Sequence, residues 1–236
     1  MYRSGKLWIF FALLVVAAAT PVHSRASKAQ ASKWTTDSIL DQLDSESKTF
    51  RSLTADIERT KVTVVVNDKS TEAGQILVRK DDKMRIDFTK PDPRTILRIG
   101  NDLYLYNPKI KQIEQYDLSK RRALVDQFLL LGFGTSGNAL KKSFLPSLLG
   151  EETIDNRKTL KLELTPKSDD VRNEVSKIEI WIDEATWLPD QQEFFETGSG
   201  DYLIIHYTNV VRNANISDNS FKQKWPKDVA HVKPQG

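Results

Sequence analysis

Cysteine is absent from the 236-residue sequence. This absence excludes disulfide bonds, thiolate catalysis and metal sites with cysteine ligands. It also excludes a lipid attached through an N-terminal cysteine. The folded state therefore depends on a hydrophobic core, and the chain is long enough to form one full domain.

Histidine is scarce, with three in the chain. His206 and His231 are far apart in sequence and lack metal-ligand spacing. No G-x-S-x-G motif or phosphate-binding loop occurs, and Gly134–Gly137 misses the former by one residue. We predict that the protein is not an enzyme, that it needs no metal or cofactor, and that His206 has a structural role.

A large excess of one charge is also lacking, because 35 basic residues face 32 acidic ones. This balance argues against a nucleic-acid-binding protein, which would need a strongly basic face. The one basic cluster is Lys120–Arg122. It is either a solvated helix start, the interpretation we favour, or a contact for anionic headgroups or an acidic partner.

Only one long apolar run is present, from Leu7 to Ala19. It follows a short basic segment and is too short to span a bilayer with ease. Val22 and Ser24 occupy the −3 and −1 positions of a cleavage site. We predict that residues 1–24 are a removed signal peptide and that the mature protein is periplasmic. The alternative is an uncleaved N-terminal anchor.

After the signal peptide, residues 25–34 are small and polar, and we expect a disordered lead-in. Residues 35–236 are predicted to form a single domain. Its first element is a helix that Thr36 can cap. The apolar residues assigned to one face of this helix are Ile39, Leu40, Leu43, Phe50 and Leu53.

The segment from Gly74 to Asp117 has the pattern of an antiparallel meander. Met84, Ile86 and Phe88 alternate with charged residues, which gives one apolar and one charged face. Turn residues separate the strand-like runs. The question for function is what covers the apolar face.

Two apolar segments in the middle of the chain, 123–133 and 138–149, are predicted to be helical. Strands resume after them. Together the patterns predict about 10–11 antiparallel strands, and a sheet of that size should curl, with helices on its concave face. Either a packed core or a cavity for an apolar ligand can lie between them, and the sequence pattern leaves both open.

The mature chain resembles the LolA family of periplasmic lipoprotein carriers in the order of its elements. The most specific matches are Gly74-Gln-Ile-Leu-Val-Arg-Lys80, Pro91-Asp92, Leu103-Tyr-Leu-Tyr-Asn-Pro108, Leu164-Thr-Pro-Lys167 and Trp225-Pro226-Lys227-Asp228-Val229. The resemblance implies a mainly β fold with a helical lid (α+β): an unclosed antiparallel half-barrel with helices over its concave, apolar face.

The resemblance also implies a function. Such a carrier shields the acyl chains of lipoproteins, which an ATP-driven transporter releases from the inner membrane. It delivers them to an acceptor at the outer membrane, or to that membrane itself. We expect a monomer. Two other functions remain open: a carrier of another lipid or glycolipid, and a periplasmic lipid-sensing regulatory domain.

The resemblance assigns roles to particular residues. A family arginine that latches the lid corresponds here to Lys80, which lacks the planar fork of arginine. Arg79 could replace it, or Lys80 could be an ordinary turn residue. The predicted lid residues, some of which are expected to be ordinary helix core, are Phe128, Leu130, Leu131 and Phe133. The predicted cavity residues are Met84, Ile86, Phe88, Ile96, Leu103 and Leu105.

Overall fold

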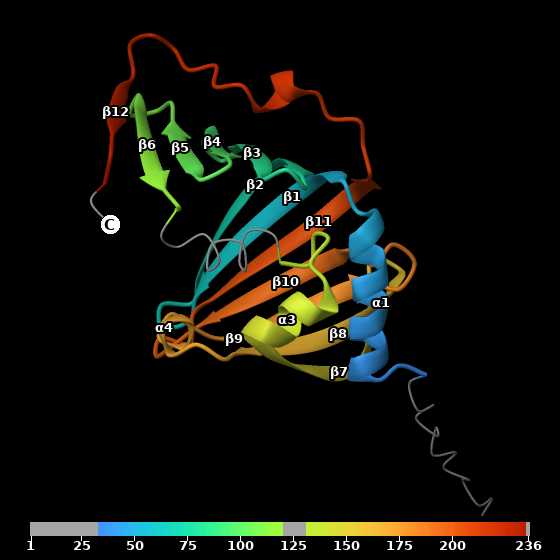
Figure 1. Ribbon diagram of the computed structural model, residues 1–236. Helices are drawn as coiled ribbons and strands as arrows, with labels where there is room; N and C mark the ends of the chain where they lie inside the picture. The colour runs from blue at the N-terminus through green and yellow to red at the C-terminus, as the bar shows by residue number, and fades with distance from the viewer. Residues whose placement is uncertain (1–32, 120–130, 235–236) are drawn as a thin grey trace, which may run out of the picture. The chain divides into compact units, whose positions relative to one another are not determined.

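A single sheet of 12 strands dominates the part of the chain that the computed structural model describes, residues 33–119 and 131–234 (Figure 1). The strand order is β12-β6-β5-β4-β3-β2-β1-β11-β10-β9-β8-β7. The elements are α1 (Thr36–Thr49), β1 (Ser52–Thr63), β2 (Asp68–Arg79), β3 (Lys83–Lys90), β4 (Arg94–Ile99), β5 (Asp102–Asn107), β6 (Gln112–Asp117), α3 (Gly137–Ser143), β7 (Phe144–Ile154), β8 (Arg157–Pro166), α4 (Asp169–Arg172), β9 (Val175–Asp183), β10 (Pro189–Glu196), β11 (Tyr202–Arg212), η1 (Asp218–Phe221) and β12 (Ala230–Val232).

The predicted fold class is confirmed. Neighbouring strands are antiparallel throughout, except that β12 runs parallel to β6. The order begins with β12 and ends with β7, so the sheet stays open at both edges. The right-handed twist of successive strands curls so wide a sheet, and the helices α1 and α3 lie against one face of it (Figure 1).

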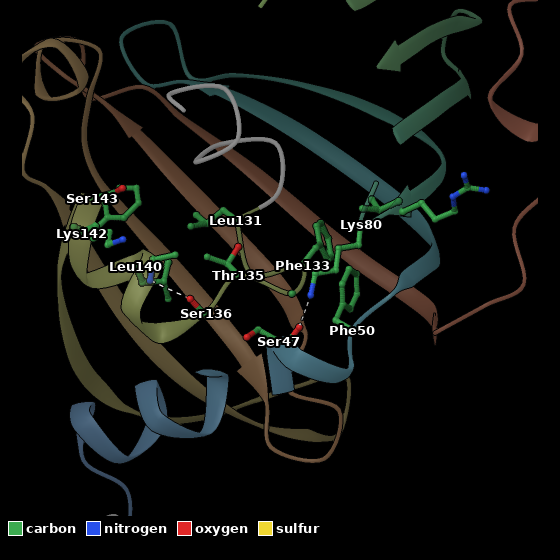
Figure 2. A pocket seen from close by; sticks show the side chains of 15 residues that line it. Ser47, Phe50, Lys80, Leu131, Phe133, Thr135, Ser136, Leu140, Lys142 and Ser143 are labelled. Atoms are coloured by element: carbon green, nitrogen blue, oxygen red, sulfur yellow. Dashed lines mark hydrogen bonds between the residues drawn. The ribbon is translucent and has the colours of Figure 1, made fainter. Parts of the chain in front are cut away.

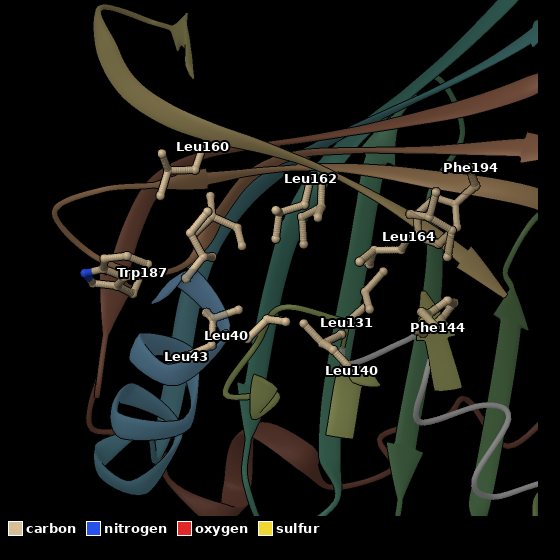
Figure 3. Packing of buried hydrophobic residues seen from close by; sticks show 14 residues of the cluster. Leu40, Leu43, Leu131, Leu140, Phe144, Leu160, Leu162, Leu164, Trp187 and Phe194 are labelled. Atoms are coloured by element: carbon tan, nitrogen blue, oxygen red, sulfur yellow. The ribbon is translucent and has the colours of Figure 1, made fainter. Parts of the chain in front are cut away.

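The apolar side of α1 packs against one half of the sheet. Its residues Ile39, Leu40 and Leu43 are buried there together with Leu140 of α3 (Figure 3). Beneath them lie side chains of β8, such as Leu162, and of β9, such as Ile180. A capping box of Thr35 and Ser38 begins α1. The cluster explains why the short helices are stable, since most helical stability in proteins comes from such packing.

Close approach of α3 to α1 requires glycine at position 137. A Cβ atom added there would lie 2.1 Å from the carbonyl oxygen of Leu40, a backbone atom that cannot swing away. Gly137 lies between the two predicted helical segments, 123–133 and 138–149. Its role is contact between the two helices.

The opposite face of β3 to β6 is covered by the C-terminal segment. Phe221 of η1 is buried against Leu97, Tyr104 and Ile113, and Trp225 packs on the edge of the same cluster. The rings of Tyr106 and Trp225 lie 5.1 Å apart. This face of the sheet is therefore a solid core.

The prediction of a helix over residues 138–149 was wrong in its second half. Only Gly137–Ser143 is helical, and Phe144 begins β7. Pro146 falls in this stretch and Gly150 follows it directly, and both residue types disfavour a helix interior. β7 instead pairs with β8, with Leu148 opposite Leu162. The leucine spacing fits a helix and a strand equally, and the partner strand decides between them.

Two smaller differences between prediction and structure concern the number of strands and the bounds of α1. The described sheet has 12 strands because β7 and the short β12 add to the expected set. The helix α1 is capped by Thr35 and ends at Thr49, so Phe50 is its C-cap and Leu53 belongs to β1. None of the helices in residues 33–119 and 131–234 has the length and apolarity needed to cross a membrane.

Several predictions lie outside the described residues: the signal peptide over 1–24, most of the lead-in over 25–34, the basic cluster at 120–122, and two lid residues, Phe128 and Leu130.

Candidate functional site

A band of apolar side chains crosses the inner face of the sheet, the face on which α1 and α3 lie. The strand register places Ile76 of β2 opposite Ile86 of β3, and Ile86 opposite Ile96 of β4. On the other side of β2, Ile57 of β1 is opposite Tyr207 of β11. Paired residues in antiparallel strands share one face, so these five side chains form one continuous surface.

This surface lines a half-open cavity of about 310 Å³, which we call the sheet cavity. Four of the predicted residues lie in its wall: Met84, Ile86, Phe88 and Ile96. Its size is at the lower end of the range for ligand pockets, and its lining is mostly apolar, as is usual for such pockets. The other lining residues are Ile57, Arg59, Ile76, Val175, Gln192, Phe194, Glu196, Leu203, Ile205 and Tyr207.

The remaining two predicted residues, Leu103 and Leu105, lie on β5 outside the wall of this cavity. Leu105 is opposite Ile96 and Leu103 is opposite Arg98, so both share the inner face. Both are half-buried. They extend the apolar surface by one strand beyond the cavity.

The sequence reasoning missed the half of the cavity wall that comes from β10 and β11. Residues 202–211 have the pattern of a strand, but nothing local shows that Tyr207 pairs with Ile57 and Ile205 with Arg59 across the sheet. Gln192 is the least expected member, since its polar side chain is buried at 2% exposure. β10 reads Pro189-Asp-Gln-Gln-Glu-Phe-Phe-Glu196, and nothing in this mostly polar stretch distinguishes the buried Gln192 from its polar neighbours.

Gln192 connects the sheet to the segment that follows the undescribed residues 120–130. Its Nε2 donates to the carbonyl oxygen of Leu131 over 2.5 Å. Its Oε1 accepts a hydrogen bond of 3.1 Å from the hydroxyl of Tyr207. Burial raises the pKa of Tyr207, which keeps this hydroxyl a neutral donor.

The two predicted lid residues that are described, Leu131 and Phe133, are both buried. Leu131 joins the cluster beneath α1 and α3. Phe133 packs edge-on against Tyr207, with ring centroids 5.0 Å apart. These contacts place residues 131–133 on the inner face of the sheet, next to the sheet cavity.

A second pocket, of about 500 Å³, lies between the end of α1, the end of β2 and α3 (Figure 2). Its lining mixes apolar residues such as Phe50 and Leu140 with the polar residues Ser47, Lys80 and Lys142. It adjoins the sheet cavity, since Val78 in its wall is the register partner of Met84.

Lys80 lies at the mouth of this second pocket. Its Nζ donates to the carbonyl oxygen of Ser47 over 2.9 Å, which ties the end of β2 to the last turn of α1 (Figure 2). A cation near a helix C-terminus is also favoured by the helix dipole. Arg79, the alternative latch, points elsewhere: it pairs with Asp81 and with Asp218 of the C-terminal segment.

Charged side chains gather at one end of the sheet cavity. Arg59 and Glu196 line it, and Arg59 is the register partner of Glu72. Arg94 donates from Nη2 to Glu72 Oε2 and lies over the ring of Phe88, 5.1 Å from its centroid. The cavity therefore has an apolar body and one ionic end.

A separate ionic cluster is buried at the start of β8 and β10. Asp190 is 2% exposed, and its Oδ1 lies 2.9 Å from Arg157 Nη2. Desolvation raises the pKa of Asp190 to about 6, against the opposing effect of Arg157. Nearby, His206 Nε2 lies 2.9 Å from Asp155 Oδ2. Over residues 33–119 and 131–234, no group of three or more histidines and carboxylates is placed to hold a metal ion.

The raised pKa of Asp190 makes stability depend on pH. Because the folded protein binds this proton more tightly than the unfolded chain, the contribution of Asp190 is fully present below about pH 4 and is lost as the pH rises through about 6. We expect the melting temperature of the wild type to fall relative to that of Asp190→Asn across this range.

The measurement is thermal unfolding of both proteins at several pH values. Asp92→Asn, at an exposed ion pair, is the control and should run parallel to the wild type. A constant difference between wild type and Asp190→Asn would contradict the assignment.

A curated protein of Methanocaldococcus jannaschii matches most of the chain. The chain is 26% identical over 186 residues to this relative, the uncharacterized protein MJ0687, and the match covers 79% of this chain and 50% of the relative. The chain therefore spans about half the length of the curated relative it matches.

Solved structures match over most of the chain. An uncharacterized conserved protein from Thermus thermophilus has a TM-score of 0.56 and 13% identity, covering 84% of this chain and 98% of the other. MucB, a Pseudomonas aeruginosa protein, has a TM-score of 0.50 and 15% identity, covering 80% of this chain and 62% of MucB. The LolA superfamily protein NE2245 from Nitrosomonas europaea has a TM-score of 0.41 and 19% identity, and the match covers 80% of this chain and 98% of the other.

At these identities the structural matches bear on the fold alone. The chain shares the fold of the Thermus thermophilus protein. A family model described only as an uncharacterized protein matches residues 80–216, more than half of the chain. The chain thus belongs to this family of uncharacterized proteins.

Proposed function

We propose that the protein is a carrier that shields lipid acyl chains in the sheet cavity. The observation that carries the proposal is the cavity of about 310 Å³ on an apolar sheet face, beside the segment that contains Leu131 and Phe133. The opposite face of β3 to β6 is filled by the C-terminal segment, so at β3 and β4 the cavity lies on the inner face alone.

The energetics favour a reversible carrier. Transfer of one CH₂ group out of water contributes about 0.8 kcal/mol, so complete shielding of several chains would hold them too tightly for release. A cavity at the lower end of the ligand-pocket range shields an acyl chain only in part. Partial shielding is compatible with both loading and delivery.

The finer form of the proposal is that the cargo is lipoprotein, moved from the inner to the outer membrane. An ATP-driven transporter of the inner membrane would load the carrier, and an outer-membrane acceptor or that membrane itself would receive the cargo. In this scheme the protein acts in the periplasm after removal of residues 1–24. The hydrogen bond from Lys80 to Ser47 would hold the end of α1 against β2 as the cavity fills.

The test is binding of an environment-sensitive apolar dye to the purified protein. We expect stoichiometric binding and displacement of the dye by a palmitoylated peptide, but not by the same peptide without its acyl chain. Mass spectrometry of solvent extracts would identify lipid that co-purifies. Dye fluorescence no higher than with a globular control protein would refute the carrier function.

A further inference from the structure

The ionic end of the sheet cavity has more hydrogen-bond donors than acceptors. Each guanidinium carries five N–H donors, while each carboxylate can only accept. Arg59 and Arg94 share one carboxylate, that of Glu72: Arg94 donates to Oε2, and Arg59 Nε lies 3.8 Å from the same oxygen. Two positive charges therefore face one negative charge.

The second carboxylate at this end, that of Glu196, is already engaged by other groups. Glu196 Oε1 already accepts from Lys61 Nζ, and Oε2 accepts from Ser199 Oγ over 3.4 Å. Lys61 also lies 3.9 Å from Asp201. These groups form a separate network of two carboxylates and one ammonium with a net charge of −1, which balances the formal charge of the arginine pair with Glu72. What stays in excess at the arginine pair is therefore hydrogen-bond donors.

The arginine pair includes an N–H donor that makes no hydrogen bond. Within the described ranges, the Nε–H of Arg94 is buried and has no hydrogen-bond partner. Burial lowers the pKa of Arg59, and the nearby Arg94 lowers it further. A guanidinium that has lost part of its hydration gains from an additional anion, because the electrostatic interaction is stronger where water is displaced.

The arginines are also placed relative to the apolar wall. Arg94 lies over the face of Phe88, whose ring lines the cavity, and Arg59 lines the cavity itself. An amphiphile with its chain among Ile76, Ile86 and Ile96 would bring its polar end to this pair.

We propose that Arg59 and Arg94 bind the anionic headgroup, a carboxylate or a phosphate, of an amphiphile whose acyl chain occupies the sheet cavity. This inference rests on the proposed function and adds the chemistry of the ligand's polar end. Arginine suits the task because its planar fork matches the geometry of both anions.

The test compares three ligands with the same hydrocarbon length: hexadecanoate, hexadecyl phosphate and the neutral monopalmitoylglycerol. Each is titrated against dye-loaded protein. We expect the wild type to bind at least one anionic ligand about tenfold more tightly than the neutral one, as charge-assisted hydrogen bonds predict. The better of the two anionic ligands distinguishes a phosphate headgroup from a carboxylate.

The variants Arg59→Gln and Arg94→Gln should each reduce this preference, measured in each variant as the ratio of its affinities for the anionic ligand and for monopalmitoylglycerol. Lys158→Gln removes the same charge from an exposed position in β8 and should retain the full preference. Equal affinities of the wild type for charged and neutral ligands would overturn the inference alone. An intact preference in a variant that carries both Arg59→Gln and Arg94→Gln would do the same. Failure of all three ligands to bind would overturn the carrier function as well.

Discussion

Replacement of Ile86 by glutamate is expected to abolish lipid binding and to leave the protein folded. Ile86 lies in the middle of β3, between its register partners Ile76 and Ile96, and it borders the sheet cavity. In the ligand-free protein the carboxylate can stay hydrated in the cavity. With an acyl chain bound it would be desolvated without a partner, which costs several kcal/mol. Dye titration and thermal unfolding measure the two effects.

Leu97→Glu is the matched control for this experiment. Leu97 lies on the neighbouring strand but on the opposite face, fully buried against Tyr104 and Phe221. There a carboxylate has no cavity to enter, so we expect global unfolding. If Ile86→Glu unfolds in the same way, the inner face is a packed core. If it folds and still binds lipid, the ligand lies elsewhere.

Replacement of Gly74 by alanine is expected to destabilise the fold by about 3 kcal/mol or more, a loss typical of severe overpacking. A Cβ atom at this position would lie 2.0 Å from the carbonyl oxygen of Asp87 and 2.7 Å from Cα of Phe88. Both are backbone atoms of β3, so β2 and β3 would have to separate. If the two strands separate, Ile76 no longer pairs with Ile86, and lipid binding should fall as well.

The measurement is urea-induced unfolding, with Gly198→Ala as control. Gly198 has a positive φ of 84° but open space around it, so alanine there incurs only backbone strain, roughly 1–2 kcal/mol. Equal destabilisation in the two variants would mean that the close approach at Gly74 is relieved at little cost. Gly74 also opens the first segment by which the sequence resembles the LolA family, and the steric contact gives a physical reason for glycine there.

Local pattern was sufficient for the inner face of the meander. Met84, Ile86 and Phe88 alternate with charged residues, and in the structure these three side chains line the cavity while Asp87 lies on the other face with Thr95. Alternation works in β3 because its inner face borders the apolar cavity and its other face carries the ion pair of Arg85 and Asp87. The period of 2 then determines which residues share a surface.

Local pattern failed where the partner decides the conformation. The leucines of 144–149 fit a helical period, yet β8 offers a strand edge, and pairing with it outweighs helix propensity. Pro146 and Gly150 were the available warnings. Leu103 and Leu105 share the correct face but lie one strand beyond the cavity wall, a distance that alternation cannot specify.

The sequence alone determined the mainly β class, the alternation that produces an apolar sheet face, and the absence of cysteine chemistry. Only the tertiary structure brought Gln192 and Tyr207 to that face and set Arg59 beside Arg94 at its end. These residues come from strands far apart in the chain, and their proximity depends on the register between strands. Register is a property of pairs of strands, and no single strand's sequence contains it.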